Sequence, residues 1–141
     1  MKKRGVILCI LSAFIICIFA GCAMAGQTVP NYEQITPEEA KAFMENETGY
    51  VILDVRTEEE FAEGHIKNAV LIPDYEIAEK AESVLTDKKQ LILVYCRSGR
   101  RSKLASEELV KMGYSNVKEF GGIIDWPYEI VTDFAHNKAD G

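Results

Sequence analysis

The sequence lacks an excess of positive charge. Its 16 lysine and arginine residues are outnumbered by 22 aspartate and glutamate residues, which gives a net charge of −6. A negatively charged chain is repelled by phosphate backbones and by anionic membrane surfaces. The charge balance therefore argues against nucleic acid as a partner and against electrostatic adhesion to a membrane. Internal repeats and low-complexity segments are also absent, so the 141 residues are expected to form one globular domain.

A long apolar run is missing as well. The apolar stretch at residues 5–20 has sixteen residues, whereas a transmembrane helix needs roughly 20. It follows the basic residues Lys2, Lys3 and Arg4, and this order is typical of a secretory signal peptide. An uncleaved N-terminal anchor stays open as the alternative.

The residues that follow this stretch carry a second targeting signal. Phe19-Ala20-Gly21-Cys22 resembles the lipobox of bacterial lipoproteins, in which a small pair precedes a cysteine that is diacylated and becomes the new N-terminus. The resemblance implies a signal peptide at residues 1–21 and a flexible tether at residues 22–30. Two acyl chains on Cys22 would be enough for stable anchoring. We therefore expect an exported protein on the extracytoplasmic face of the cell membrane, attached to the membrane only through its lipid.

Free cysteine is scarce in the expected mature chain. Cys9 and Cys17 lie in the signal segment and Cys22 would carry the lipid, which leaves Cys96. No internal disulfide is then expected. A free thiol on an exported protein is open to oxidation, so we expect a functional reason for Cys96.

From residue 31 to residue 135, apolar runs of strand length alternate with polar segments of helical spacing. This alternation predicts an α/β domain built on a mostly parallel sheet. The runs at 50–55 and 91–95 are nearly continuous apolar segments, as in central strands that are covered on both faces. Further strands are predicted at 32–35, 69–72 and 117–120, helices are predicted at 37–45, 57–64, 74–85 and 99–112, and a flexible tail is predicted at 136–141.

Two threonines mark helix starts. Thr36 and Thr57 each precede a group of acidic residues, and Glu60 follows Thr57 at the spacing of a capping box. The acidic run at 58–60 is interpreted as a solvated helix start. The apolar stripe of the last helix is expected to contain Leu104, Leu109 and Met112.

The strongest chemical signal is the run Cys96-Arg97-Ser98-Gly99-Arg100-Arg101, which lies between a predicted strand and a predicted helix. The carboxyl end of a strand is where an open α/β sheet places its ligand site. A tight turn at Gly99 would aim backbone N–H groups at the sulfur, and the helix N-terminus and three arginines favour an anion. We therefore expect Cys96 to be a thiolate nucleophile. An inert, buried cysteine is the alternative.

The arginine spacing distinguishes two chemistries that use such a loop. Cys-dependent phosphatases need an arginine at the seventh position, where this chain has Ser102. Here the arginine comes at the sixth position, Arg101, which makes a smaller cradle that suits a sulfane sulfur. The spacing favours sulfur transfer, and a phosphatase or arsenate reductase stays open as an alternative.

Together these segments resemble the single-domain rhodanese family of thiosulfate and persulfide sulfurtransferases. Besides the loop at 96–101, the resemblance rests on the segments at 53–56 and 64–69, and on Gly121-Gly122-Ile123 with Trp126. It implies a three-layer domain at 31–135, with a parallel sheet of about five strands flanked by helices. It also implies a persulfide on Cys96, without metal or organic cofactor, and small sulfur anions or thiol acceptors as partners.

The resemblance further implies that the substrate-binding residues are Arg97, Ser98, Gly99, Arg100 and Arg101. Asp54 and Arg56 lie at a predicted strand end before a helix cap, and this position favours a structural salt bridge that fixes the loop over a catalytic role. A non-catalytic module for binding or sulfur sensing is the remaining alternative.

Overall fold

The computed structural model describes residues 31–132. The expected signal peptide at 1–21, the tether at 22–30 with Cys22, and the tail at 136–141 lie outside these residues. Residues 133–135 of the expected domain also lie outside them. No helix in the described part of the chain is long and apolar enough to cross a membrane.

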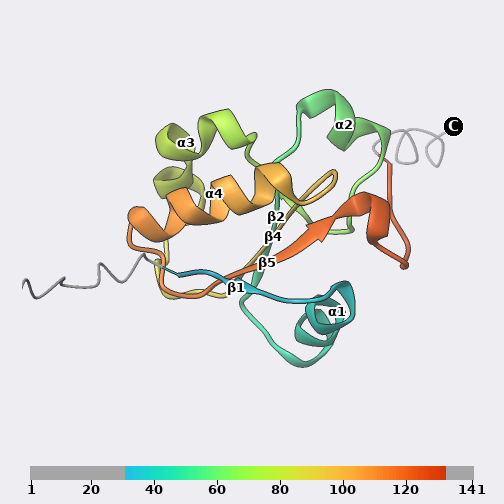
Figure 1. Ribbon diagram of the computed structural model, residues 1–141, viewed down its shortest axis with the longest axis horizontal. Coiled ribbons are helices and arrows are strands. Elements are labelled where there is room, and N and C mark those ends of the chain that lie inside the picture. Colours follow the sequence, from blue (N-terminus) through green and yellow to red (C-terminus); the bar gives the residue numbers. More distant parts are fainter. Residues whose placement is uncertain (1–30, 133–141) are drawn as a thin grey trace, which may run out of the picture.

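Strands and helices alternate along the described chain (Figure 1). The strands are β1 (Glu33–Gln34), β2 (Val51–Asp54), β3 (Val70–Leu71), β4 (Ile92–Cys96) and β5 (Val117–Gly122). The α-helices are α1 (Pro37–Asn46), α2 (Glu58–Glu63), α3 (Ile77–Val84) and α4 (Arg100–Lys111). Two 3₁₀ turns, η1 (Asp74–Glu76) and η2 (Ile123–Asp125), precede α3 and follow β5.

The five strands form one parallel sheet in the order β1-β5-β4-β2-β3. Helices α3 and α4 cover one face and α1 covers the other (Figure 1). All five residues of the central strand β4 are buried, because both of its faces are covered. The predicted three-layer α/β fold with a five-stranded parallel sheet is therefore confirmed.

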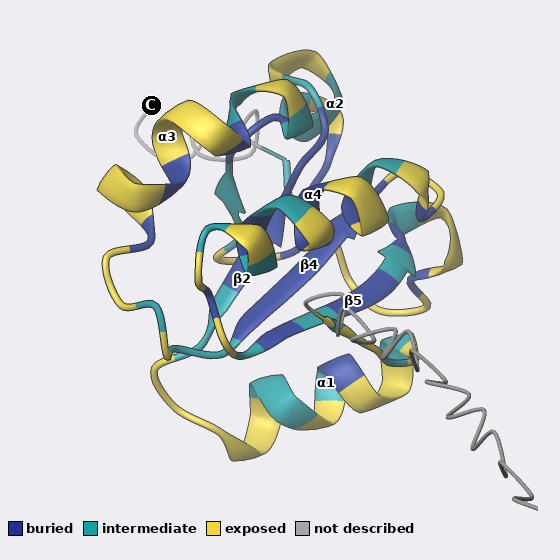
Figure 2. Cartoon of the chain, turned by 60° about the vertical axis from the view of Figure 1, so that its left-hand side comes forward, coloured by how far each residue is buried: buried dark blue, intermediate teal, exposed yellow. Residues whose placement is uncertain are grey.

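Alternation along β4 assigns its side chains to two separate cores. Ile92, Val94 and Cys96 belong to the core beneath α3 and α4. Leu93 and Tyr95 belong to the core beneath α1. Because successive side chains of a strand point to opposite faces, Cys96 lies on the α4 side of the sheet. Figure 2 shows the buried strands between helices whose outer surfaces are exposed.

Both predicted helix starts carry a complete capping box. Thr36 accepts the N–H of Glu39, whose carboxylate accepts the N–H of Thr36. Thr57 and Glu60 form the same reciprocal pair at the start of α2. These contacts fix where each helix begins after its preceding extended segment.

The predicted apolar stripe of α4 was wrong at Leu104, whose side chain is 52 % exposed. Leu109 is fully buried, and Met112 packs partly buried against the same core. A helix turns by about 100° per residue, so a position five residues before Leu109 lies on a different face. The buried residues of α4 are Ser102, Ala105, Ser106 and Leu109.

Candidate active site

Cys96 is the last residue of β4 and lies at the carboxyl end of the sheet. Its side chain is 1 % exposed. Three residues later, Gly99 occupies the N-cap position of α4 with φ of 97°, a left-handed conformation that glycine adopts readily. This turn brings the Gly99 N–H to the cysteine, and it donates a hydrogen bond of 3.0 Å to Sγ.

The loop passes very close to the end of β5. A Cβ atom on Gly122 would overlap the carbonyl group of Arg97 and would lie 2.5 Å from Ser98 Cα. Ile124 also donates its N–H to the Arg97 carbonyl at 3.3 Å. The missing side chain at Gly122 therefore allows the loop to fold back against β5.

Ser102, at the seventh position, is a buried partner of Cys96. The cysteine Sγ–H donates to Ser102 Oγ at 3.4 Å. The serine hydroxyl in turn lies 2.5 Å from Oε1 of Glu119 on β5. Glu119 is buried and its Oε1 also accepts the N–H of Gly121 at 2.8 Å. Three elements, β4, α4 and β5, thus contribute to one polar cluster beneath the loop.

Neither Ser102 nor Glu119 was a predicted site residue. A period of two along β5 places Glu119 on the same face as the buried Val117. A carboxylate on the core face of a predicted strand is the sequence signal that could have indicated a polar partner inside the fold.

Arg101, the sixth residue of the loop, is paired with Glu60 on α2. Its two terminal nitrogens each donate a hydrogen bond of 2.7 Å to the carboxylate. The Arg101 hydrogen bonds lower the pKa of Glu60 to about 2, and Glu60 raises the pKa of Arg101. The interpretation of residues 58–60 as a solvated helix start was therefore wrong for Glu60.

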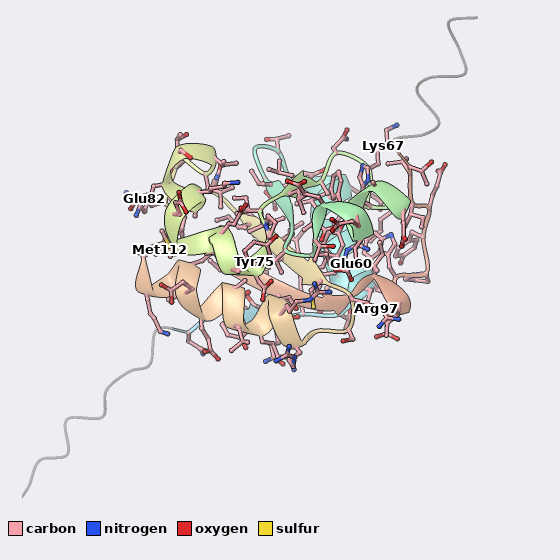
Figure 3. The ribbon with its side chains drawn as sticks, turned by 90° about the horizontal axis from the view of Figure 1, so that it is seen from above. Glu60, Lys67, Tyr75, Glu82, Arg97 and Met112 are labelled. Atoms are coloured by element: carbon pink, nitrogen blue, oxygen red, sulfur yellow. The ribbon has the colours of Figure 1, made fainter. Side chains whose placement is uncertain are left out.

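Arg97, Ser98 and Arg100 are exposed around the buried cysteine. Figure 3 shows Arg97 and Glu60 toward one end of the molecule and Met112, beyond α4, at the opposite end. The loop therefore combines a buried sulfur with cationic side chains at its surface. This arrangement attracts an anion toward Cys96.

Asp54 and Arg56 form a buried salt bridge at the carboxyl end of β2, with Nη2 and Oδ2 separated by 2.7 Å. The same Nη2 donates to the carbonyl of Gly64 at 2.7 Å. Burial alone would lower the pKa of Arg56, but the hydrogen bonds and charge of Asp54 outweigh it and raise that pKa. The pair ties the end of β2 to the segment after α2.

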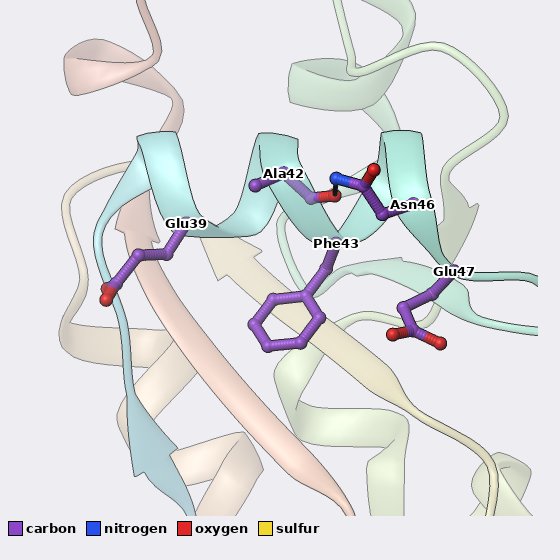
Figure 4. A pocket seen from close by; sticks show the side chains of 5 residues that line it. All are labelled: Glu39, Ala42, Phe43, Asn46 and Glu47. Atoms are coloured by element: carbon purple, nitrogen blue, oxygen red, sulfur yellow. Dashed lines mark hydrogen bonds between the residues drawn. The ribbon is translucent and has the colours of Figure 1, made fainter.

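A separate hollow of about 320 Å³ lies beside α1 (Figure 4). Its lining residues come from α1 and its C-cap, and they include none of the loop residues. Within residues 31–132, no three histidine, cysteine, aspartate or glutamate side chains are grouped so that they could hold a metal ion. The polar cluster under the loop contains the buried Cys96 thiol, with hydrogen bonds to Gly99 and Ser102, and is the candidate active site.

Residues 36–127 match the family model described as the rhodanese-like domain. The chain belongs to this family. The matched segment contains strands β2 to β5, together with the loop after Cys96, and begins after β1.

Two relatives of this rhodanese-like domain are named as sulfurtransferases. Thiosulfate sulfurtransferase PspE of Escherichia coli is 38% identical over 73 residues, which cover 52% of this chain and 70% of that protein. A sulfurtransferase of Allochromatium vinosum is 36% identical over 77 residues, which cover 54% of this chain and 70% of that protein. A solved rhodanese with anions from E. coli has a TM-score of 0.56 and 35% identity, covering 59% of this chain and 98% of that chain.

Proposed function

We propose that this rhodanese-like domain is a sulfurtransferase that moves a sulfane sulfur through a persulfide on Cys96. The donor is thiosulfate or a persulfide, and the acceptor is a thiophile such as cyanide or a thiol. The observation that carries the proposal is the position of Cys96 Sγ at the carboxyl end of β4, where it accepts the Gly99 N–H at 3.0 Å. A sulfur atom held by a backbone donor at a strand end is placed for nucleophilic attack.

The reaction has two balanced steps. The Cys96 thiolate attacks the outer sulfur of thiosulfate, the sulfur–sulfur bond of thiosulfate breaks, and sulfite leaves with the bonding electron pair. The product is a cysteine persulfide anion, and a preorganised N–H donor such as that of Gly99 stabilises this negative charge. The acceptor then attacks the outer sulfur of the persulfide and regenerates the thiolate.

The cationic side chains of the loop have different roles in this proposal. Arg97 and Arg100 are exposed and guide an anionic donor toward the sulfur. Arg101 is held by Glu60 and acts mainly through its fixed positive charge. Ser98 and Gly99 contribute backbone N–H groups to the cradle.

The test is a mass measurement of sulfur bound to Cys96. After incubation with thiosulfate, the peptide that contains Cys96 should gain the mass of one sulfur atom and lose it again on addition of cyanide. Cys96→Ser should gain no sulfur. Absence of the added sulfur with thiosulfate and with persulfide donors would overturn the proposal.

Two further outcomes would assign the site to another class of protein. Hydrolysis of an aryl phosphate that disappears in Cys96→Ser, without sulfur transfer, would identify a Cys-dependent phosphatase. Partner binding that persists in Cys96→Ser, without turnover of any donor, would identify a binding or sensing module.

We also propose, from the sequence, that the domain is exported and anchored by a lipid on Cys22. Membrane-bound protein from cells should begin at Cys22 and carry diacylglycerol on it. Cys17→Ala should leave this modification in place, because Cys17 lies in the expected signal peptide. Lipidated, processed protein from Cys22→Ala would contradict the proposal.

A further inference from the structure

Three buried side chains form a continuous polar chain that ends at the sulfur of Cys96. Cys96, Ser102 and Glu119 are 1 %, 0 % and 2 % exposed. Sγ lies 3.4 Å from Ser102 Oγ, and that oxygen lies 2.5 Å from Glu119 Oε1. Burying the charge of a carboxylate is unfavourable unless the charge is paired or hydrogen-bonded, so the buried position of Glu119 requires an explanation.

The serine hydroxyl has a single hydrogen to donate. Its four neighbours at hydrogen-bond distance are Glu119 Oε1 at 2.5 Å, the Gly99 carbonyl at 3.1 Å, the Gly121 carbonyl at 3.3 Å and Cys96 Sγ at 3.4 Å. The shortest contact is the one to Glu119, as expected for a hydroxyl that donates to a carboxylate. Ser102 then turns a lone pair toward Cys96 and accepts its S–H.

A thiolate requires this chain of hydrogen bonds to reverse. A serine lone pair that faces a negative sulfur is repulsive, and a second negative charge on Glu119 disfavours the thiolate further. Both problems disappear if the cysteine proton moves to Ser102 Oγ while the serine proton moves to Glu119 Oε1. Ser102 then donates to the thiolate, and protonated Glu119 donates to Ser102.

We propose that Glu119 is a positioning residue that accepts the proton of Cys96 through Ser102. One S–H bond breaks, one O–H bond forms on Glu119, and the hydroxyl of Ser102 exchanges its hydrogen. The net charge of the three groups stays at −1 throughout. The thiolate therefore forms without releasing a proton to solvent from a cysteine that is almost fully buried. The use of this thiolate for sulfur transfer rests on the proposed function, but the proton relay itself does not.

Other charged groups surround the relay and act on all of its states. The arginines favour a thiolate whether or not Glu119 is present, so they shift every titration in the same direction. The relay is therefore tested by comparing the pH profile of wild-type protein with the pH profiles of variants that lack one of its members. The charged groups of the loop and of neighbouring elements are Arg97, Arg100 and Arg101 of the loop and α4, Glu60 of α2, Asp74 of η1 and the Asp54–Arg56 pair of β2. The Lys118–Glu33 pair lies on the opposite face of the sheet, where Lys118 Nζ is 5.0 Å from the ring centroid of Phe43.

The test is the pH dependence of Cys96 alkylation by iodoacetamide in the full chain, followed on the peptide that contains Cys96. Two coupled groups lose their protons in two macroscopic steps. The alkylation rate of wild-type protein should therefore rise in two steps with increasing pH, which appear as two rising limbs of the pH profile. The first limb corresponds to the state in which Cys96 and Glu119 share one proton, and the second to the state in which both are ionised. Wild-type protein with a single limb would overturn the proposal.

Two variants separate the relay from a structural role of Glu119. Glu119→Gln should lose the lower limb, and its single midpoint should lie below the upper midpoint of wild-type protein because the neighbouring charge is gone. Ser102→Ala should also lose the lower limb, but its midpoint should lie above that of Glu119→Gln because the carboxylate remains. Two limbs that survive in Glu119→Gln would overturn the relay. Glu33→Gln makes the same charge change on β1 and should keep both limbs.

A measurement on wild-type protein keeps the test valid if a variant does not fold. Between the two limbs, infrared spectra should contain the carbonyl band of a protonated carboxylic acid. Alkylation of Cys96 removes the negative sulfur, so the band should disappear as Glu119 releases its proton. A spectrum without this loss would contradict the relay.

The outcomes for the relay and for the proposed function can be told apart. Two limbs in the alkylation profile without sulfur transfer would retain the relay and refute the proposed function. Sulfur transfer with a single limb would refute the relay alone.

Discussion

Arg101 and Glu60 are 41 residues apart in the sequence, yet they form a bidentate ion pair with two N–O distances of 2.7 Å. Glu60 also accepts the N–H of Thr57 at the start of α2. One carboxylate therefore caps α2 and holds the sixth residue of the Cys96 loop. Helix α2 has six residues and none of them is buried, so this ion pair is a principal tie between α2 and the loop.

Loss of this ion pair should make the protein less sensitive to acid. The pKa of Glu60 is lowered from its ordinary value of 4.5 to about 2, chiefly by its hydrogen bonds with Arg101. Its stabilising effect is present above pH 4.5 and is lost as the pH falls from 4.5 toward 2. Urea denaturation of Glu60→Gln should show a loss of about 1 kcal/mol at pH 7, and the difference from wild-type protein should shrink below pH 4.

The control for this prediction is Glu45→Gln, which breaks the exposed Lys41–Glu45 pair of α1. That pair should be worth only about 0.3–0.5 kcal/mol. Equal losses in the two variants would show that the Glu60–Arg101 geometry adds nothing beyond an ordinary surface pair.

A methyl group at Gly122 should displace the Cys96 loop. In Gly122→Ala the new Cβ would overlap the Arg97 carbonyl group, so we expect a loss of about 1–3 kcal/mol together with loss of sulfur transfer by the folded protein. Gly49→Ala is the control, because Gly49 has φ of 72° and open space around its Cβ position. It should lower stability by about 1 kcal/mol and leave sulfur transfer intact. A fully active Gly122→Ala would show that the loop tolerates displacement.

Removal of the Arg97 charge should weaken the binding of an anionic donor. Arg97→Ala should raise the KM for thiosulfate roughly fivefold, equivalent to about 1 kcal/mol, with a smaller effect on kcat. Added salt should raise the KM of wild-type protein more than that of the variant, because screening removes the same attraction. Lys89→Ala makes an equal charge change just before β4, at the opposite end from Cys96, and should leave the KM unchanged. An unchanged KM in Arg97→Ala would exclude a role for Arg97 in donor binding.

Neutralising Asp54 should be strongly destabilising. Asp54→Asn leaves the buried Arg56 guanidinium without its counter-ion, and loss of one partner of a buried pair costs about 3–5 kcal/mol. The double variant with Asp54→Asn and Arg56→Met should recover part of this loss, because the uncompensated charge is removed. Asp87→Asn, at an exposed site, should change the free energy of unfolding by less than about 0.5 kcal/mol. A double variant less stable than Asp54→Asn would contradict this explanation.

The sequence was informative wherever the decisive residues are neighbours in the chain. Apolar runs predicted the strands now seen as β2 and β4, and the Thr57 and Glu60 spacing predicted the start of α2. The loop was recognised because Cys96 to Arg101 are contiguous. Local propensity and local hydrogen bonding are sufficient in these cases.

Contacts between distant segments were decided by the tertiary structure. Glu60 looked like part of a solvated acidic run until the fold brought α2 to Arg101. Glu119 lies 17 residues from Ser102 and meets it because α4 packs across β5. Leu104 was assigned to the wrong face because apolar character does not specify which side of a helix the sheet covers. The sequence by itself determined the alternation of strands and helices along the chain and singled out Cys96 as the expected nucleophile, since both depend on short segments. The side chains that contact Cys96 depend on which surfaces of the sheet and helices meet, and only the folded chain fixes that.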